Sequence, residues 1–399
     1  MTESDTLQGQ FADSLGGGGG VAGVDTLRPL TVAGSTAISA DDTDVAVGEA
    51  SLALATDTIA IGFSARSNNG SSAIAVGSKS LGYGSASTAI GSNAQSTGTI
   101  TTAVGANSQA HESHSVAIGS TAKSNNNGSI AIGHSTVSNG KMSTAIGVSA
   151  TSNGVKSTAI GIGSISDGTN STAIGPYSST ITAKSLAFGH SAFSGFNSDQ
   201  SIAIGSEARV LSSADHSIGI GPSASISTGG NNLAIGDAAT ITAGTHKSIA
   251  IGSNIGVSQG SNRSVVIGSD ADVNSSSNKS VVIGDSASTT AGVAGSVMIG
   301  ADVSGSQSSN RAIVIGKGSN TWHSHNESIT IGVSQTSRGA NVGLIGASQT
   351  VTGGVQSTVS NSNINNGEFT IDIDETNSQF TFRGKNSSGS VITGTVAWV

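Results

Sequence analysis

A glycine that follows three mostly aliphatic residues recurs along most of this chain of 399 residues. The motif reads IAIG at Gly62 and ITIG at Gly332, and the series begins at Gly48 and ends at Gly346. The copies are mostly 14 residues apart up to Gly189 and mostly 16 apart beyond it. A short period with aliphatic residues in constant places is the signature of a solenoid, in which each repeat packs on its neighbours. The sequence therefore predicts one long repeat body rather than a chain of unrelated globular domains.

Side chains within each copy alternate in size, as they do along a β-strand. A large apolar residue precedes the glycine, Ala usually stands before it, and Ile, Val, Leu or Thr comes one place earlier. This period of two, rich in β-branched residues, predicts a short strand. We expect both large side chains to face the core, leaving the Ala on a face that another chain approaches closely. The expected repeat core includes Ile61, Ile90, Ile118, Ile160, Ile251, Ile283 and Ile331.

A turn and a second strand are expected after each glycine. The position after the glycine accepts Pro176 and Pro222, which donate no backbone hydrogen bond, so this position lies outside the packed core. Further on, the small residues Ala65 and Ser67 flank Arg66, which must point to water. In the longer copies Val or Ile often replaces the Ser, and larger residues replace several of the Ala. Two parallel strands per coil predict a flattened β-roll with a fuller core in its second half.

The interior of a single roll of this kind is expected to be thin. Aromatic residues make up only 3% of the chain, and the repeated positions are rich in Ala, Ser and Thr. Each buried CH₂ group contributes about 0.8 kcal/mol, and these small side chains have few such groups. A lone roll is therefore under-stabilised, which favours a homo-oligomer of chains laid side by side.

The strand motif and its period resemble the head repeats of the YadA-type trimeric adhesins. The segments 115–119 and 157–161 read SVAIG and STAIG, each with a small residue three places after the glycine. The resemblance covers residues 41–347 and implies a left-handed parallel β-roll, three chains around one axis and a role in surface attachment. The expected fold is therefore all-β: a parallel β-roll solenoid of 14- and 16-residue coils, homotrimeric, with a small C-terminal β cap.

Residues before the repeats differ from them in composition. Residues 1–15 lack the basic start and apolar run of a signal sequence. We expect them to form a docking peptide anchored by Phe11 and Leu15. Residues 16–40, which begin with five glycines, predict a flexible tether.

Residues after the repeats also differ from them in sequence pattern. We expect residues 348–366 to form a polar connector, and residues 367–399 alternate in the manner of three short strands. The latter predict a C-terminal cap or tip containing Phe369, Phe380, Phe382 and Trp398. Such a cap would close the open end of the solenoid, which otherwise templates aggregation.

A repeat body with a docking peptide before it and a β tip after it resembles a bacteriophage fibre. We expect a tail or head fibre on the exterior of the virion, anchored to a capsid or tail protein through its N-terminus. It would contribute to attachment by contacting a glycan or protein of the host surface. One alternative is the passenger or head fragment of a bacterial trimeric autotransporter adhesin. Another is a virion decoration fibre without a specific receptor.

Charge and hydropathy argue against two other classes of partner. The chain carries 24 acidic and 16 basic residues, a net charge of −8, whereas nucleic-acid binding favours a basic surface. Its apolar runs are too short for a membrane helix, so we expect no membrane insertion.

Catalytic chemistry is not expected either. Glycan-degrading enzymes present paired carboxylates in an aromatic-lined cleft, whereas the acidic residues here are scattered over turns. We therefore expect no enzymatic activity, no catalytic residue and no cofactor. A weak metal candidate is the pair His323 and His325, placed in a variable stretch between two repeat glycines, where solvent exposure is the stronger interpretation.

A basic column is the remaining candidate site. Lys247, Arg263, Lys279 and Arg311 each lie five residues before a repeat glycine, and the series is interrupted by Gly295 and Glu327. Stacked coils bring such residues about 5 Å apart, which suits an acidic surface polysaccharide. Pairing with nearby acidic residues, within or between chains, is the stronger interpretation. Those acidic residues are Asp270, Asp272, Asp285 and Asp302.

Overall fold

The computed structural model describes most of the repeat body and three later strands. The described residues are 38–39, 43–290, 292–306, 309–322, 326–338, 343–347, 350–352, 369–374, 379–385 and 391–397. They form β-strands and turns, and no described residue is helical. The chain divides into two compact units, Met1–Asn170 and Ser171–Val399, here called the N-terminal and C-terminal units.

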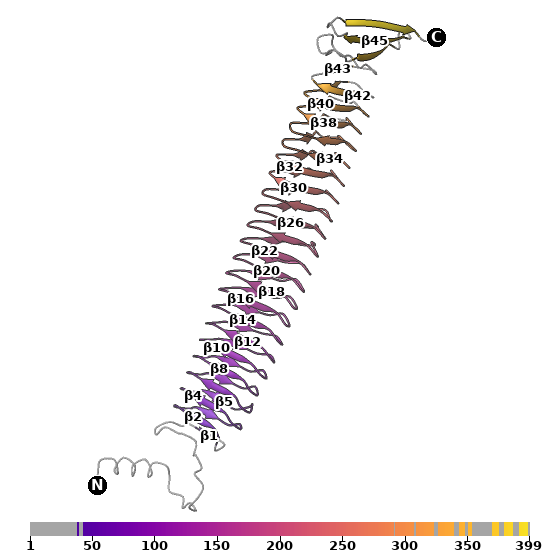
Figure 1. The fold of residues 1–399 in the computed structure, drawn as a ribbon. Helices are drawn as coiled ribbons and strands as arrows, with labels where there is room; N and C mark the ends of the chain where they lie inside the picture. Colours follow the sequence, from indigo (N-terminus) through magenta and orange to yellow (C-terminus); the bar gives the residue numbers. More distant parts are fainter. Residues whose placement is uncertain are drawn as a thin grey trace, which may run out of the picture. The chain divides into compact units, whose positions relative to one another are not determined.

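The N-terminal unit stacks coils of two short strands each (Figure 1). Its first sheet contains β2 (Val45–Val47), β4 (Ile59–Ile61), β6 (Ile74–Val76), β8 (Thr88–Ile90), β10 (Thr102–Val104), β12 (Val116–Ile118), β14 (Ile130–Ile132), β16 (Thr144–Ile146) and β18 (Thr158–Ile160). Its second sheet contains β1 (Ile38–Ser39), β3 (Leu52–Ala53), β5 (Arg66–Ser67), β7 (Leu81–Gly82), β9 (Gln95–Ser96), β11 (Gln109–Ala110), β13 (Lys123–Ser124), β15 (Val137–Ser138), β17 (Thr151–Ser152) and β19 (Ile165–Ser166).

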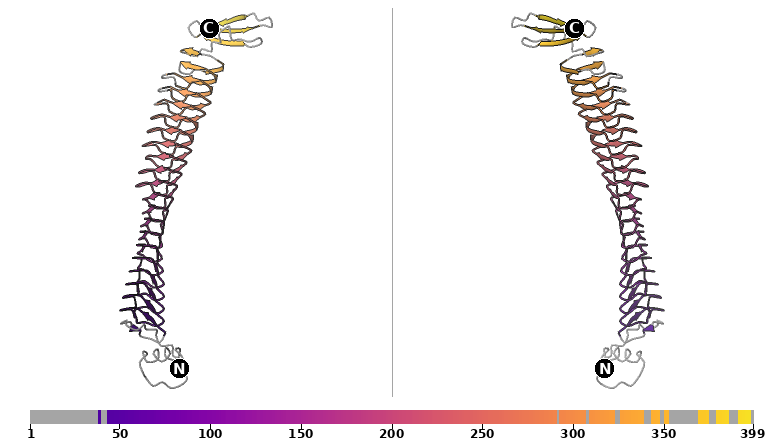
Figure 2. Two further views of the ribbon diagram at one scale, coloured as in Figure 1. Left: turned by 90° about the vertical axis from the view of Figure 1, so that its left-hand side faces the viewer. Right: turned by 90° about the vertical axis from the view of Figure 1, so that its right-hand side faces the viewer.

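The C-terminal unit repeats this arrangement, and Figure 2 shows the stacked strands from two further sides. Its first sheet contains β20 (Thr172–Ile174), β22 (Leu186–Phe188), β24 (Ile202–Ile204), β26 (Ile218–Ile220), β28 (Leu233–Ile235), β30 (Ile249–Ser253), β32 (Val265–Ser269), β34 (Val281–Ile283), β36 (Val297–Ile299), β38 (Ile313–Lys317), β40 (Ile329–Val333) and β42 (Gly343–Ala347). Its second sheet contains β21 (Ser179–Thr180), β23 (Phe193–Ser194), β25 (Arg209–Val210), β27 (Ser225–Ile226), β29 (Thr240–Ile241), β31 (Gly256–Val257), β33 (Asp272–Val273), β35 (Ser288–Thr289), β37 (Ser304–Gly305), β39 (Asn320–Thr321), β41 (Thr336–Arg338) and β43 (Thr350–Thr352).

Strands of successive coils pair in parallel and in a constant register. In the N-terminal unit Ala103 is the partner of Ala117, 14 residues later. In the C-terminal unit Ile249 is the partner of Val265, 16 residues later. Equivalent side chains therefore stack into columns along each unit, and the all-β parallel solenoid expected from the sequence is confirmed.

The structure reverses the expected orientation of the first strand. The Ala side chains are fully buried inside the coil, as at Ala60, Ala89 and Ala117. By contrast, Ile61 and Ile118 are each 38% exposed. The prediction that the large aliphatic residues fill the interior of one chain is therefore wrong. Ile90 is also exposed, and the other residues of that set are half-buried: Ile160, Ile251, Ile283 and Ile331.

Coil width explains this reversal. The second strand directs Ala65 and Ser67 inward and leaves Arg66 exposed, as predicted. Such small side chains leave little space between the two sheets, and only another small residue fits opposite them. Alternating side chains of a strand can face the interior in two ways: either the Ala or the large residues beside it point inward. The narrow interior favours the arrangement with Ala inside.

Hydroxyl pairs contribute to the interior of several 14-residue coils. The Oγ atoms of Ser124 and Ser129 lie 2.6 Å apart, and those of Ser138 and Ser143 are equally close. Because buried hydroxyl groups are costly without partners, these pairs allow serine to line the core.

The C-terminal unit has a fuller core, as predicted. Larger side chains from both strands are fully buried there, and they belong to one continuous cluster. Members of the cluster include Val210, Ile226, Ile241, Val257, Val266, Val273, Val282, Met298 and Val314.

Three later strands form an antiparallel sheet of their own. β44 (Phe369–Asp374) pairs with β45 (Gln379–Lys385), which pairs with β46 (Val391–Ala397). Ile371 is the partner of Phe382, and Phe382 is the partner of Gly394. The three strands expected for the C-terminal cap are therefore present, while Trp398 lies outside the described residues.

A column of glycines sets the closest approach between coils. Gly119 has a φ of 131°, and a Cβ placed on it would lie 2.3 Å from the carbonyl oxygen of Gly133. Neither this φ nor this distance suits a residue with a side chain.

We predict that Gly119→Ala destabilises the surrounding coils. The strained φ alone costs about 1–3 kcal/mol, and displacement of the neighbouring backbone adds to it. Hydrogen exchange of the amides of β10, β12 and β14 measures the effect. Ser120→Ala, at an exposed neighbouring position, is the control and should leave exchange unchanged. Equal protection in the two variants would contradict a steric role for the glycine column.

Candidate functional site

Two surface features of the described residues repeat from coil to coil. The first is the apolar strand face, which we define as the outward side chains on either side of the buried central residue, Ala in most coils, in the first sheet of each unit. In the N-terminal unit it includes Ile61, Ile90 and Ile118, which are 38–41% exposed. Contiguous exposed apolar surface of this kind marks an interaction site.

The second feature is the basic ladder, defined as Lys247, Arg263, Lys279 and Arg311. All four have a left-handed backbone conformation with φ between 58° and 60°. The amide of Arg263 donates to the carbonyl oxygen of His246 at 2.9 Å, and the amide of Lys279 donates to that of Asn262 at 2.8 Å. The same backbone geometry in each coil therefore positions these exposed cations in one column, with Gly295 between Lys279 and Arg311.

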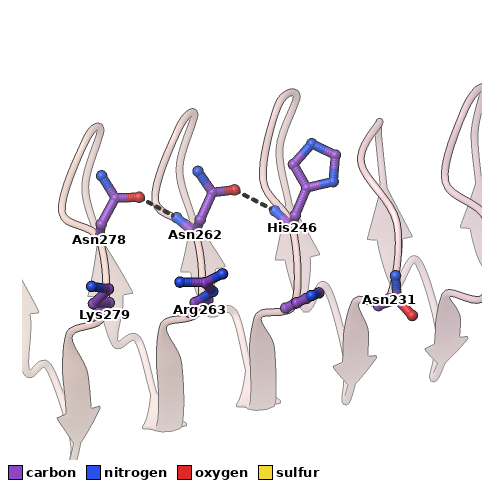
Figure 3. A pocket seen from close by; sticks show the side chains of 7 residues that line it. Asn231, His246, Asn262, Arg263, Asn278 and Lys279 are labelled. Atoms are coloured by element: carbon purple, nitrogen blue, oxygen red, sulfur yellow. Dashed lines mark hydrogen bonds between the residues drawn. The ribbon is translucent and has the colours of Figure 1, made fainter.

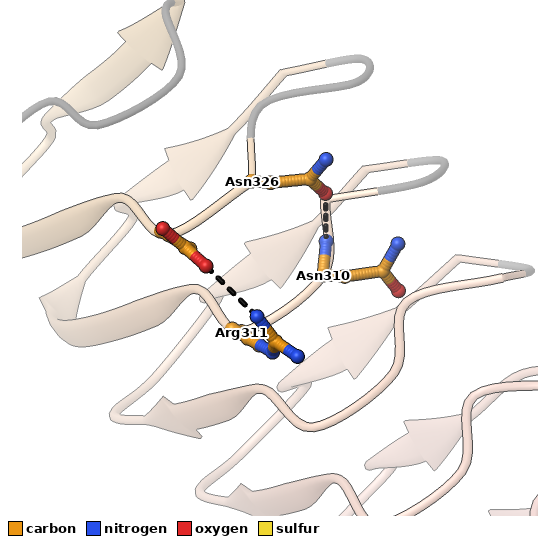
Figure 4. Close-up of polar contacts among 4 residues, drawn as sticks. Asn310, Arg311 and Asn326 are labelled. Carbon is orange, nitrogen blue, oxygen red and sulfur yellow. Dashed lines mark hydrogen bonds and ion pairs between the residues drawn. The ribbon is translucent and has the colours of Figure 1, made fainter.

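An asparagine precedes most of these cations and links adjacent coils. The Oδ1 atom of Asn262 accepts a hydrogen bond from the amide of His246 at 2.7 Å, and that of Asn278 accepts from the amide of Asn262 at 2.8 Å (Figure 3). Further along, Oδ1 of Asn326 accepts from the amide of Asn310 at 2.9 Å (Figure 4). Sequence reasoning missed this asparagine column, although an Asn or His before the cation repeats every 16 residues.

The asparagines and cations line an open groove. One part has a volume of about 590 Å³ and extends from Asn231 to Lys279. A second part of about 500 Å³ extends from Asn278 to Glu327. Because Asn278 and Lys279 line both parts, the groove continues along the coils of the C-terminal unit.

The cations of the ladder have few acidic partners. Arg311 pairs with Glu327 at 2.9 Å, which is the only salt bridge within the described ranges. Both side chains are more than half exposed, and such a surface pair contributes little to stability. None of the four aspartates proposed as partners lies within salt-bridge distance of the ladder in this chain, so pairing with the aspartates of another chain remains a prediction.

Asp272 is a described acidic residue with a shifted pKa. Partial burial raises the pKa of its carboxyl group above the ordinary value, and the neighbouring carboxylate of Asp270 raises it further. A hydrogen bond to the backbone of Gly256 opposes this shift. The raised pKa means that the ionised form of Asp272 is less favourable in the folded protein than in the unfolded chain.

The remaining candidate site residues cannot be placed from the described part of the chain. His323, His325, Phe11, Leu15 and Trp398 lie outside the described residues. Among the residues that are described, no group of three or more His, Cys, Asp or Glu side chains could hold a metal ion. The described part of the chain also contains no helix long and apolar enough to cross a membrane.

Comparison with known families identifies the repeat. The YadA head domain repeat matches residues 42–65, 83–108, 110–136, 138–164, 152–178 and 166–192. These segments, which make up about a third of the chain, are similar to YadA head repeats. The matched repeats and the parallel β-solenoid are similar to those of a structural adhesin. No curated protein matches the chain significantly. The basic ladder lies in the 16-residue coils, beyond the matched YadA segments.

We predict that Asn278→Ala loosens the groove locally. The substitution leaves the amide of Asn262 without its acceptor, at a cost of about 1 kcal/mol, which corresponds to roughly fivefold faster hydrogen exchange of that amide. Asn278→Asp retains an acceptor oxygen and should keep the amide protected. Similar exchange rates in the wild-type protein and the Ala variant would show that the asparagine column is not structural.

A second prediction concerns pH. The pKa of Asp272 is higher in the folded protein than in the unfolded chain. The stability of the fold therefore falls as the pH rises from the unfolded pKa through the folded pKa, because Asp272 becomes ionised. Asp272→Asn should therefore raise the melting temperature at neutral pH and leave it unchanged at acidic pH, where both proteins are neutral at this position. Thermal melts across this pH range measure the difference. A difference in melting temperature that stays constant at all pH values would contradict a raised pKa for Asp272.

Proposed function

We propose that this protein is a homotrimeric attachment fibre. The observation that carries the proposal is the apolar strand face, which is repeated on successive coils and exposed in a single chain. YadA head domains form homotrimers, and association of three chains would cover this face. Fully burying an Ile side chain contributes about 1.5–3 kcal/mol, so covering the exposed part of each one contributes about 0.5–1 kcal/mol. Repeated over many coils, such terms stabilise an assembly whose separate chains have a thin Ala and Ser interior.

The proposed location is the exterior of a bacteriophage virion. Support comes from the sequence: residues 1–15 contain Phe11 and Leu15 and precede five glycines, as expected for a docking peptide on a flexible tether. Residues 41–347 would then form the shaft, residues 348–366 a connector and residues 367–399 the cap. Three copies of the antiparallel sheet β44–β46 would share a core that one small sheet lacks.

Two alternatives share this fold. The YadA repeats support the head of a bacterial trimeric autotransporter adhesin as strongly as they support a virion fibre. A decoration fibre without a receptor would differ only in what its surface contacts. All three have a trimeric shaft, so trimerisation and location are tested separately.

Trimerisation is tested by placing a charge on the proposed interface. Ile118→Asp should shift the protein from trimer towards monomer in sedimentation equilibrium, because each trimer would bury three uncompensated carboxylates. Ile165→Asp is the matched control, since Ile165 is also 38% exposed but lies on the second sheet. Equal effects of the two substitutions, or a monomeric wild-type protein, would refute the proposed interface.

Location is tested by cryo-electron microscopy of the particle or cell that carries the protein. The virion proposal expects density for residues 1–15 inside a capsid or tail protein, with a threefold shaft outside. Phe11→Ser combined with Leu15→Ser should remove the fibre from the particle without changing the trimer. Finding the protein on a bacterial outer surface and on no virion would favour the adhesin alternative.

A further inference from the structure

We propose that the basic ladder and its asparagine column bind a linear acidic polysaccharide along the C-terminal unit. This inference deepens the proposed attachment function, on which it rests, by naming the chemical class of the receptor. The argument uses the regular spacing of the cations, the hydrogen-bonding groups between them and the absence of charge compensation along most of the groove.

Spacing is fixed by the solenoid. Adjacent parallel strands lie about 4.8 Å apart, so the four coil steps from Lys247 to Arg311 cover roughly 19 Å. Each cation projects from the same backbone position in its coil, and all four are exposed. A linear polymer with acidic groups at regular intervals is the ligand that such a row of charges fits.

Hydrogen-bonding groups in the groove suit a sugar chain. A side-chain amide both donates and accepts hydrogen bonds, as does a sugar hydroxyl group. Asn262 and Asn278 line the groove beside Arg263 and Lys279, so a row of amides runs parallel to the row of cations (Figure 3). An Arg or Lys side chain can in turn donate charge-assisted hydrogen bonds to the carboxylate of an acidic sugar.

Other polyanions fit less well. Double-stranded DNA carries about one charge per 1.7 Å, a much higher density than the ladder's one cation per coil. Single-stranded nucleic acids stack their bases on aromatic side chains, and the residues that line the two described parts of the groove include no Phe, Tyr or Trp. The lining also lacks large apolar side chains that would insert into a lipid surface.

Two positions limit the ladder and offer gain-of-function tests. Glu327 occupies the next ladder position after Arg311 and pairs with it (Figure 4). Gly295 leaves a gap, but its φ of 69° is close to that of Lys279 at 60°. A Cβ on Gly295 would have Arg311 Cγ as its neighbour at 3.7 Å, which is ordinary contact, so a lysine fits there.

Binding to polygalacturonate oligosaccharides, measured by isothermal titration calorimetry on the full chain, tests the proposal. Dextran serves as the neutral polymer control. Arg263→Gln combined with Lys279→Gln should weaken binding about tenfold and reduce its dependence on salt, since two partly screened charge contacts are lost. Arg209→Gln combined with Lys317→Gln removes the same charge from exposed positions outside the groove and should weaken binding much less.

The reverse substitutions should strengthen binding. Gly295→Lys fills the gap and Glu327→Gln releases Arg311, so each is expected to lower the dissociation constant about threefold. Circular dichroism and sedimentation of every variant confirm that fold and oligomeric state are kept.

Three outcomes would overturn the inference. One is no binding to polygalacturonate by the wild-type protein, and another is equal weakening by the ladder and control pairs. The third is tighter, ladder-dependent binding to single-stranded DNA or to phosphatidylglycerol vesicles, which would assign the groove to another class of macromolecule. If the protein is trimeric and particle-bound but gives any of these results, only the sugar-binding inference is wrong. If the protein is monomeric but binds the sugar, only the proposed fibre function is wrong.

Discussion

Close contact between successive coils at the glycine column is the constraint on which the rest of this structure depends. The amide of Gly119 donates to the carbonyl oxygen of Val104 at 2.7 Å, and the backbone of Gly133 occupies the space in which a side chain on Gly119 would lie. The same close contact is found at most other motif glycines within each unit, and it holds neighbouring coils in one register. A change in the length of one coil is absorbed in the turns, because the strands and the glycine must still align.

Constant register turns each position of the repeat into a column. Ala stacks on Ala inside the coil, Ile stacks on Ile or Val outside it, and in the 16-residue coils Asn stacks on Asn beside the cations. A single contact of this kind contributes little to stability, but the same contact repeated in every coil contributes substantially to the stability of the unit. The same regularity spaces charged groups evenly, which an irregular loop cannot do.

Local rules and the repeat itself made much of this fold predictable. The period gave the solenoid, and the polar Arg66 between Ala65 and Ser67 gave the orientation of the second strand. Alternation alone could not decide whether Ala60 or Ile61 faces inward, because that choice depends on the distance between two sheets. The basic column was visible from its spacing, whereas the role of Asn262 and Asn278 was not, since an asparagine in a polar turn has many possible acceptors and donors. Phe11 and Leu15 remain predictions from sequence alone.

Under the proposed function, the 14-residue coils serve association of the chains and the 16-residue coils serve recognition of the sugar. In the 14-residue coils the interior consists mainly of Ala and hydroxyl groups, so larger apolar side chains lie outside, where the proposed trimer would cover them. In the 16-residue coils Ile226, Ile241 and Met298 enter the interior, and each chain contributes more to its own stability. A coil with a fuller core tolerates exposed like charges in adjacent repeats, whose mutual repulsion would otherwise destabilise it. This argument predicts that moving the same cations into the 14-residue coils would lower the melting temperature more than the cations do where they now stand.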